Sequence, residues 1–193
     1  GIQLRYLQSL VSIFLLLAAT AGAGSFTAEM DVDTYMDAAN ASQSFSDSDL
    51  LWATSVGGEP AKEVYLSIIN ILGSQGVFDP EQIDSATLTV DAAQVERPGK
   101  ITAYFLHGAT FDAATWSDKE DYDNSVSSQT IDISQEKSYT IDVTDIIKKA
   151  VETCTEGCPY SIVLVAEDDA SVAFFSSESS EGEEPTLVYD TIE

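Results

Sequence analysis

Basic side chains are scarce in this sequence, and their scarcity limits what the protein can bind. Its 193 residues include 8 Lys and Arg against 33 Asp and Glu, a formal net charge of −25. A field of that sign repels phosphate backbones, anionic lipid surfaces and anionic polysaccharides, and it attracts cations. Nucleic acid is therefore excluded as a partner. An acidic surface of this kind also favours solubility in a salty medium, as expected of a secreted protein.

The sequence has a single histidine and lacks familiar catalytic motifs, which argues against an enzyme. His107 ends an expected strand, and no Gly-x-Ser-x-Gly accompanies it to supply a serine nucleophile. Ser55-Val-Gly-Gly58 lacks the Lys-Ser/Thr of a phosphate loop. Carboxylate pairs are expected by chance in so acidic a chain, so they do not indicate a glycosidase. We predict a non-catalytic protein and assign no catalytic residue.

Cysteine is limited to Cys154 and Cys158, in the sequence Cys-Thr-Glu-Gly-Cys-Pro. Gly157 and Pro159 favour a turn that brings the two sulfur atoms together, and in an exported protein such a pair forms a disulfide. A zinc site would need further Cys or His ligands. Because the closed loop is so short, the bond is expected to fix local shape rather than to add much chain-entropy stabilisation.

Long apolar runs are missing except for one near the N-terminus. Residues 10–19 follow Arg5 and precede Ala21-Gly22-Ala23, which has the small-x-small form of a signal-peptidase site. The run is short for a membrane span. We expect residues 1–24 to be either a cleaved secretory signal or a retained segment for assembly or anchoring, and residues 25–193 to form the folded domain.

If the N-terminal segment is retained, its apolar run is an association surface that a filament core or a bilayer must cover. The opening Gly-Ile-Gln-Leu loosely resembles the processed start of archaeal pilin-like filament subunits. A membrane is a partner in this alternative alone. The side chains expected to mediate assembly are Leu10, Val11, Ile13, Phe14, Leu15, Leu16 and Leu17.

Beyond residue 25, short runs of alternating apolar and polar residues are separated by turn signals, a pattern typical of strands. The expected strands are residues 30–36, 64–71, 86–92, 101–106, 139–143, 161–166, 171–175 and 186–189. One helix, about residues 144–154, interrupts them, with Thr144 as its N-cap and an apolar stripe from Ile146 to Val151. About eight or nine strands with one short helix predict an all-β fold, a two-sheet β-sandwich of jelly-roll type.

A series of short motifs runs along the body of the chain in a fixed order. The series is Asp33-Thr-Tyr-Met-Asp37, Asn40, Ser48-Asp-Leu-Leu51, Gly57-Gly-Glu59, Ile83-Asp-Ser-Ala-Thr-Leu88, Ala114-Thr-Trp116, Ile141-Asp-Val-Thr-Asp145, Ala173-Phe-Phe-Ser-Ser177 and Pro185-Thr-Leu-Val-Tyr189. Over roughly residues 30–190 it resembles DNRLRE-type domains. The resemblance implies a β-sandwich of extracellular proteins, often beside polysaccharide-active enzymes, and some members are carbohydrate-binding modules.

The sequence departs from this family around the third strand, where Ala61-Lys-Glu-Val-Tyr-Leu-Ser67 carries one lysine in place of the family's basic residues. Acidic sugars need cations to pair with their carboxylates. Neutral glycans are therefore the expected ligands of a module of this composition.

Aromatic residues and aspartates supply the candidate ligand-binding side chains. Trp116 and Tyr122, in the polar segment 110–128, are candidates for stacking on sugar rings, although Trp116 also fits a place in the core, as Trp52 does. Calcium is the cofactor that the loops favour, because hard cations take several oxygen ligands. Its candidate ligands are Asp31, Asp33, Asp37, Asp168 and Asp169. The Asp-Asp pair is also common turn chemistry, and EF-hand spacing is absent.

Together these features predict an extracellular or cell-surface module with a structural or adhesive role. In the main hypothesis its partners are copies of itself in a filament or sheath. The alternative is a carbohydrate-binding module for neutral glycans, secreted after signal cleavage, whose partner is extracellular polysaccharide.

Overall fold

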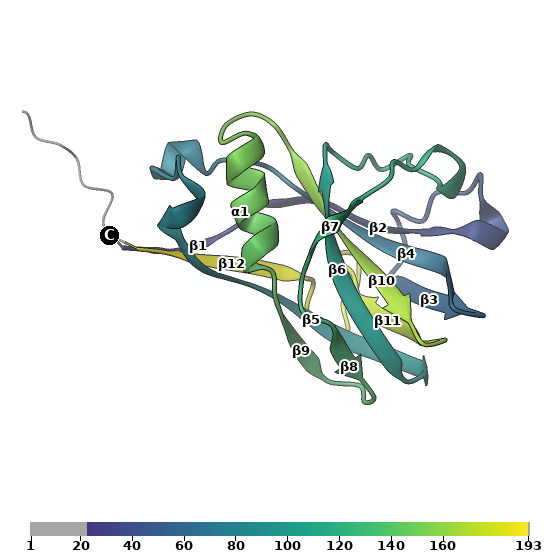
Figure 1. Ribbon diagram of the computed structural model, residues 1–193. Helices are drawn as coiled ribbons and strands as arrows, with labels where there is room; N and C mark the ends of the chain where they lie inside the picture. Colours follow the sequence, from purple (N-terminus) through teal and green to yellow (C-terminus); the bar gives the residue numbers. More distant parts are fainter. Residues whose placement is uncertain (1–22, 193) are drawn as a thin grey trace, which may run out of the picture.

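In a computed structural model, which describes residues 23–192, the chain forms a 12-stranded antiparallel sheet curled into two layers, with one α-helix at one end (Figure 1). The strands are β1 (Ser25–Thr27), β2 (Met30–Asp37), β3 (Leu50–Val56), β4 (Glu59–Ile68), β5 (Ile83–Arg97), β6 (Gly99–His107), β7 (Asp123–Ser127), β8 (Ile131–Ile133), β9 (Ser138–Asp142), β10 (Tyr160–Glu167), β11 (Ser171–Phe175) and β12 (Thr186–Thr191). The helices are α1 (Thr144–Thr153) and the 3-10 turns η1 (Ala38–Asn40), η2 (Gly73–Gln75), η3 (Pro80–Gln82) and η4 (Trp116–Asp118).

One layer consists of β2, β4, β10 and β6, with β7 and β8 paired to β6. Its register sets Leu66, Ile162 and Phe105 side by side, and all three are buried in the main core. Successive residues of a strand point to opposite faces. The next row along the layer therefore faces away from the main core.

The other layer is organised around β5, the longest strand. The first half of β5 pairs with β9 and β12, and its second half pairs with β11, which continues to β3. The β3–β4 hairpin joins the two layers. Gly57 and Gly58 form its turn with φ of +64° and +83°, a backbone conformation that matches a two-residue hairpin turn and that glycine adopts without strain.

Helix α1 closes one end of the sandwich. Ile146, Ile147, Ala150 and Val151 are buried on its inner side, as the apolar stripe predicted. The predicted N-cap is wrong, because Thr144 is the first helical residue. Its N–H and hydroxyl donate to Asp142 Oδ1 at 3.0 and 2.6 Å, so the cap comes from the preceding strand.

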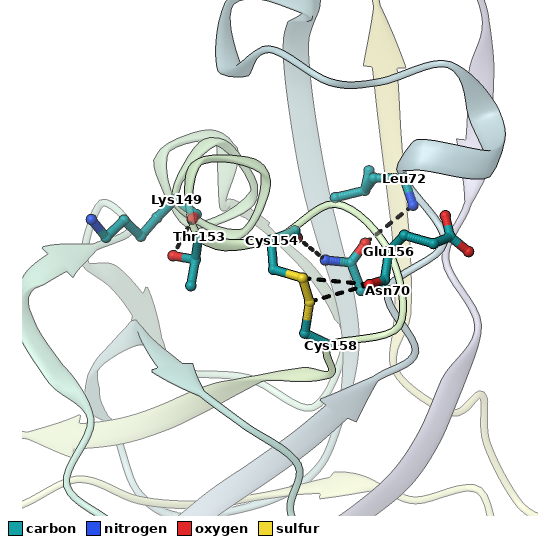
Figure 2. The surroundings of a disulfide bond; sticks show 7 residues. All are labelled: Asn70, Leu72, Lys149, Thr153, Cys154, Glu156 and Cys158. Carbon is teal, nitrogen blue, oxygen red and sulfur yellow. Dashed lines mark hydrogen bonds between the residues drawn. A yellow bond between two sulfur atoms is a disulfide. The ribbon is translucent and has the colours of Figure 1, made fainter.

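The predicted disulfide between Cys154 and Cys158 is confirmed, with the two Cα atoms 6.1 Å apart. It closes the loop that follows α1, and Figure 2 shows this loop against Asn70. The Asn70 side chain donates to the Cys154 carbonyl and accepts from Leu72 N–H at 3.1 Å, while Gly157 N–H donates to the Asn70 carbonyl at 3.3 Å. The bonded loop is thereby fixed to the segment that follows β4.

The predicted class, an all-β sandwich of jelly-roll type with one short helix, is confirmed. The predicted strand number is too low, because β1, β3, β7 and β8 were not expected. β1, β7 and β8 are short and carry little alternation, whereas β3 is seven residues long. The expected strand 64–71 is shifted: β4 begins at Glu59 and ends at Ile68, before Asn70 turns the chain. No helix of the described residues 23–192 is long and apolar enough to cross a membrane.

Candidate functional site

The face of the β2–β4–β10–β6 layer that points away from the main core carries a second apolar cluster. We call it the outer cluster; its buried members are Met36, Tyr65, Leu106, Val163 and Val165. One face of an antiparallel sheet is commonly solvated and polar. Buried apolar side chains on this face therefore require a cover.

The cover is the loop between β6 and β7, residues 108–122, which we call the covering segment. In Figure 1 it lies over the end of β2, away from α1. Its Ser117 N–H donates to the Ala41 carbonyl at 2.8 Å, and its Thr110 N–H donates to Ser67 Oγ at 3.3 Å. These bonds tie the segment to η1 on one side and to β4 on the other.

A short 3-10 turn, η4, stiffens the covering segment. Thr115 N–H and the Thr115 hydroxyl donate to Asp118 Oδ1 at 2.6 and 3.0 Å, and Ala114 and Trp116 pack on the outer cluster. These hydrogen bonds hold the pKa of Asp118 below its usual range. The Oδ1 oxygen of Asp118 is thus committed to the turn.

A buried carboxylate anchors the covering segment to β4. Glu63 is 2% exposed, its Oε2 lies 3.1 Å from Lys119 Nζ, and it accepts from Tyr65 Oη at 2.6 Å. The Lys119 ammonium also sits 4.3 Å from the centre of the Trp116 ring. A buried charge needs such partners, because leaving it unpaired in a low-dielectric site is costly.

Two tyrosines extend the cluster at its edge. The rings of Tyr104 and Tyr122 stack with centroids 4.8 Å apart. Burial, with Glu63 as the next contribution, raises the pKa of Tyr122 to about 12. Burial, followed by the same carboxylate, raises the pKa of Tyr65 still further, so its hydroxyl remains a donor to Glu63.

The covering segment leaves a recess of about 300 Å³ above the outer cluster. Met36, Tyr65 and Leu106 form its floor, and residues 109–111, 113–114 and 118–120 contribute its walls and rim. The floor is mostly apolar and the rim carries Asp118, Lys119 and Glu120. An apolar hollow with a few polar groups is the usual form of a small-ligand site.

Phe111 is the aromatic side chain that the sequence reasoning missed. It lines the recess and is 72% exposed. Its sequence signal is weak, a single large apolar residue in the stretch Gly-Ala-Thr-Phe-Asp-Ala-Ala. The sequence placed the stacking candidates in the covering segment, but only the fold shows which aromatic residue borders a hollow.

The two predicted stacking residues, Trp116 and Tyr122, lie beside the recess and do not line it. Both are half-buried against the outer cluster, and one face of Trp116 is covered by Lys119. Trp52 is half-buried at the edge of the main core, with Lys62 5.4 Å from its ring. Direct stacking by Trp116 and Tyr122 stays a prediction.

The predicted calcium ligands lie in four separate settings. Asp31 is exposed on β2, whereas Asp33 accepts from Ser177 N–H and Oγ at 2.7 and 2.6 Å, and Asp37 accepts from Ala39 N–H at 2.9 Å. Asp168 and Asp169 form the β10–β11 turn with φ of 53° and 57°. Within residues 23–192 no three carboxylate, histidine or cysteine side chains gather to hold a metal ion. Calcium binding stays a prediction.

A second hollow, about 640 Å³, lies between α1, η3 and β7. It is larger than the recess, but both of its lysines are already paired with carboxylates of its own lining. Lys148 lies 3.8 Å from Glu81, and Lys149 lies 2.8 Å from Glu152. We therefore favour the recess, where apolar surface is left open, as the functional site. The predicted assembly residues, 10–17, lie outside the described part of the chain.

An all-β sandwich with an aromatic-edged recess on one sheet face has the architecture of a carbohydrate-binding module. Residues 25–191 match carbohydrate-binding module family 96, and the chain belongs to this family. The predicted resemblance to a carbohydrate-binding-module-like sandwich is thereby confirmed. No curated protein matches the chain.

Proposed function

We propose that the chain binds polysaccharide outside the cell, without converting it, through the recess over the outer cluster. The observation that carries this proposal is Phe111, which is 72% exposed at the edge of an apolar hollow. Large apolar side chains gain free energy when a ligand removes them from water. Membership of family 96 supports sugar as that ligand, because the C–H faces of sugar rings present apolar surface to an aromatic ring.

The charges around the recess support a neutral glycan. Lys119 is the basic side chain of the lining, and it already pairs with Glu63 at 3.1 Å. Asp118 and Glu120 add negative charge at the rim of a chain whose net charge is −25. A carboxylated sugar would meet repulsion without a free cation to offset it.

The Cys154–Cys158 disulfide supports an oxidising, extracytoplasmic location. The filament hypothesis rests on residues 10–17, and the family match favours the glycan-binding alternative instead. Self-assembly through the N-terminal run is compatible with a recess on the sandwich, so it stays a separate prediction.

Substitution of Phe111 tests the proposal. We expect Phe111→Ala to weaken binding to a neutral polysaccharide about tenfold, equivalent to about 1.4 kcal/mol, because an exposed aromatic contact is lost. Affinity electrophoresis against neutral glycans, with alginate and pectate as acidic comparisons, measures the change.

The matched control is Phe78→Ala. Phe78 is 69% exposed, so it resembles Phe111 in type and exposure, but it lies next to η3 at the end of the molecule where α1 lies. It should leave affinity unchanged. Equal losses in both variants would remove the recess from the proposal, and binding to no glycan in the panel would contradict the proposed function.

A further inference from the structure

The polar groups that line the recess are almost all engaged within the protein. Tyr65 Oη donates to Glu63 at 2.6 Å, Thr110 Oγ1 lies 3.0 Å from Ser161 Oγ, and Asp118 accepts both groups of Thr115. The Lys119 ammonium is held by Glu63. Few lining groups are therefore free to bond a sugar hydroxyl placed inside the hollow.

The apolar side chains of the lining disfavour a bare sugar hydroxyl and favour a small apolar group. Met36 and Leu106 lie at the floor, while Ala109, Ala113 and Ala114 line the sides. A hydroxyl buried against these side chains loses its water without gaining a partner. A methyl group in the same place gains from leaving water.

Glu120 is the lining carboxylate with the most free acceptor capacity. It is exposed at the rim, and neither of its carboxylate oxygens accepts a hydrogen bond from the described residues, whereas Thr115 already occupies Oδ1 of the neighbouring Asp118. An amide N–H next to a buried methyl group would find this acceptor within the same site. An ester has no such N–H, and a carboxylated sugar would be repelled.

We infer that the recess recognises an N-acetylated amino sugar, with the acetyl methyl on the apolar floor and the amide N–H toward Glu120. The inference rests on the proposed function and names the class of glycan that it would take. The N-acetyl group matches both the charge of the rim and the apolar floor, because it is neutral, carries one hydrogen-bond donor and ends in a methyl group.

Two oligosaccharides with one skeleton test this inference. The β-1,4-linked tetramers of glucose and of N-acetylglucosamine differ only in the substituent at C2. Isothermal titration of the full chain should give at least about tenfold tighter binding to the acetylated tetramer. Equal affinity, or tighter binding to the glucose tetramer, would overturn the inference.

Filling the recess provides the second measurement. Ala113 is exposed on the covering segment, so Ala113→Leu should fold normally while its larger side chain occupies the hollow. It should abolish the preference for the acetylated tetramer, and Glu120→Gln should reduce it. Ala93→Leu is the matched control. Ala93 is half-exposed on β5 in the other layer, so this variant should keep the preference for the acetylated tetramer.

The outcomes separate the inference from the proposed function. If both tetramers fail to bind but another neutral polysaccharide binds through Phe111, the acetyl inference is wrong and the glycan-binding function stands. If Ala113→Leu retains the full preference, the acetyl group does not enter the recess and the inference is wrong. If no glycan binds, both are wrong.

Discussion

The two faces of the β2–β4–β10–β6 layer are both apolar at the centre, yet they are closed in different ways. The inner row of Leu66, Ile162 and Phe105 is covered by a second layer of strands. The outer row of Tyr65, Val163 and Tyr104 is covered by a single loop. A sheet covers a face fully, whereas a loop covers it in part and leaves a hollow beside its edge.

The manner of closure differs in chemistry as well as in area. The loop over the outer cluster is held by the buried Glu63–Lys119 ion pair, whereas Asp33, buried beside Leu66 on the inner face, accepts hydrogen bonds from Ser177. Rigid sheets with functional loops laid on them are a common way to build binding sites. The recess therefore exists because the outer face is closed by a loop that is held at a few points.

Breaking the Glu63–Lys119 ion pair, which holds the covering segment to β4, is expected to have the largest effect on the free energy of unfolding. Lys119→Met leaves the Glu63 carboxylate, 2% exposed, with Tyr65 as its remaining partner. Removing one member of a buried ion pair costs about 3–5 kcal/mol, and we expect the lower end because the Lys119 side chain is 20% exposed. Urea unfolding at neutral pH measures the loss.

The double variant Glu63→Gln with Lys119→Met is the control. It removes both charges, so most of the lost free energy of unfolding should return. A double variant as unstable as the single one would show that packing of the lysine stem, and not the unpaired carboxylate, dominates at this border.

A matched pair of valines compares the two faces directly. Val64 lies in the main core and Val163 in the outer cluster, and both are 0% exposed. We expect Val64→Ala to cost about 2–3 kcal/mol, because its surroundings are held by two layers and leave a cavity. Val163→Ala should cost about 1 kcal/mol, since the covering segment can settle into the space. Equal losses in urea unfolding would mean that the loop is as rigid as a sheet.

Much of the fold was predictable because its signals are local. The strand at residues 171–175 was predicted at its observed bounds, since Ser171–Phe175 is apolar and bordered by the Asp168-Asp169 turn. The α1 stripe and the disulfide follow from spacing alone. The start of β4 was missed because Glu59–Glu63 is polar, and Glu63 is buried there by a lysine 56 residues away.

The site was predictable only as far as its loop. Residues 110–128 were predicted to hold the aromatic stacking candidates, but in the structure Trp116 packs inward and Phe111 stays exposed. Which side of a loop meets a sheet depends on pairings such as Ser117 with Ala41, 76 residues apart. No local pattern encodes such a contact, so the recess had to come from the structure.

Tyrosine ionisation is expected to have the smallest effect on stability, and its measurement tests whether the outer face stays closed in solution. Burial raises the pKa of Tyr122, on the outer face, and of Tyr189, in the main core, to about 12 each. An unfolded tyrosine ionises near pH 10. Both residues should therefore contribute stability that is complete below about pH 10 and is lost between about pH 10 and 12, because the unfolded chain releases protons that the folded chain keeps.

Phenolate absorbance, compared between the parent protein and the Tyr122→Phe and Tyr189→Phe variants, assigns each ionisation. If Tyr122 ionises near pH 10 while Tyr189 ionises near pH 12, the covering segment opens while the sandwich stays folded. If both ionise near pH 12, as we expect, the loop holds the outer face as closed as the sheet holds the inner one.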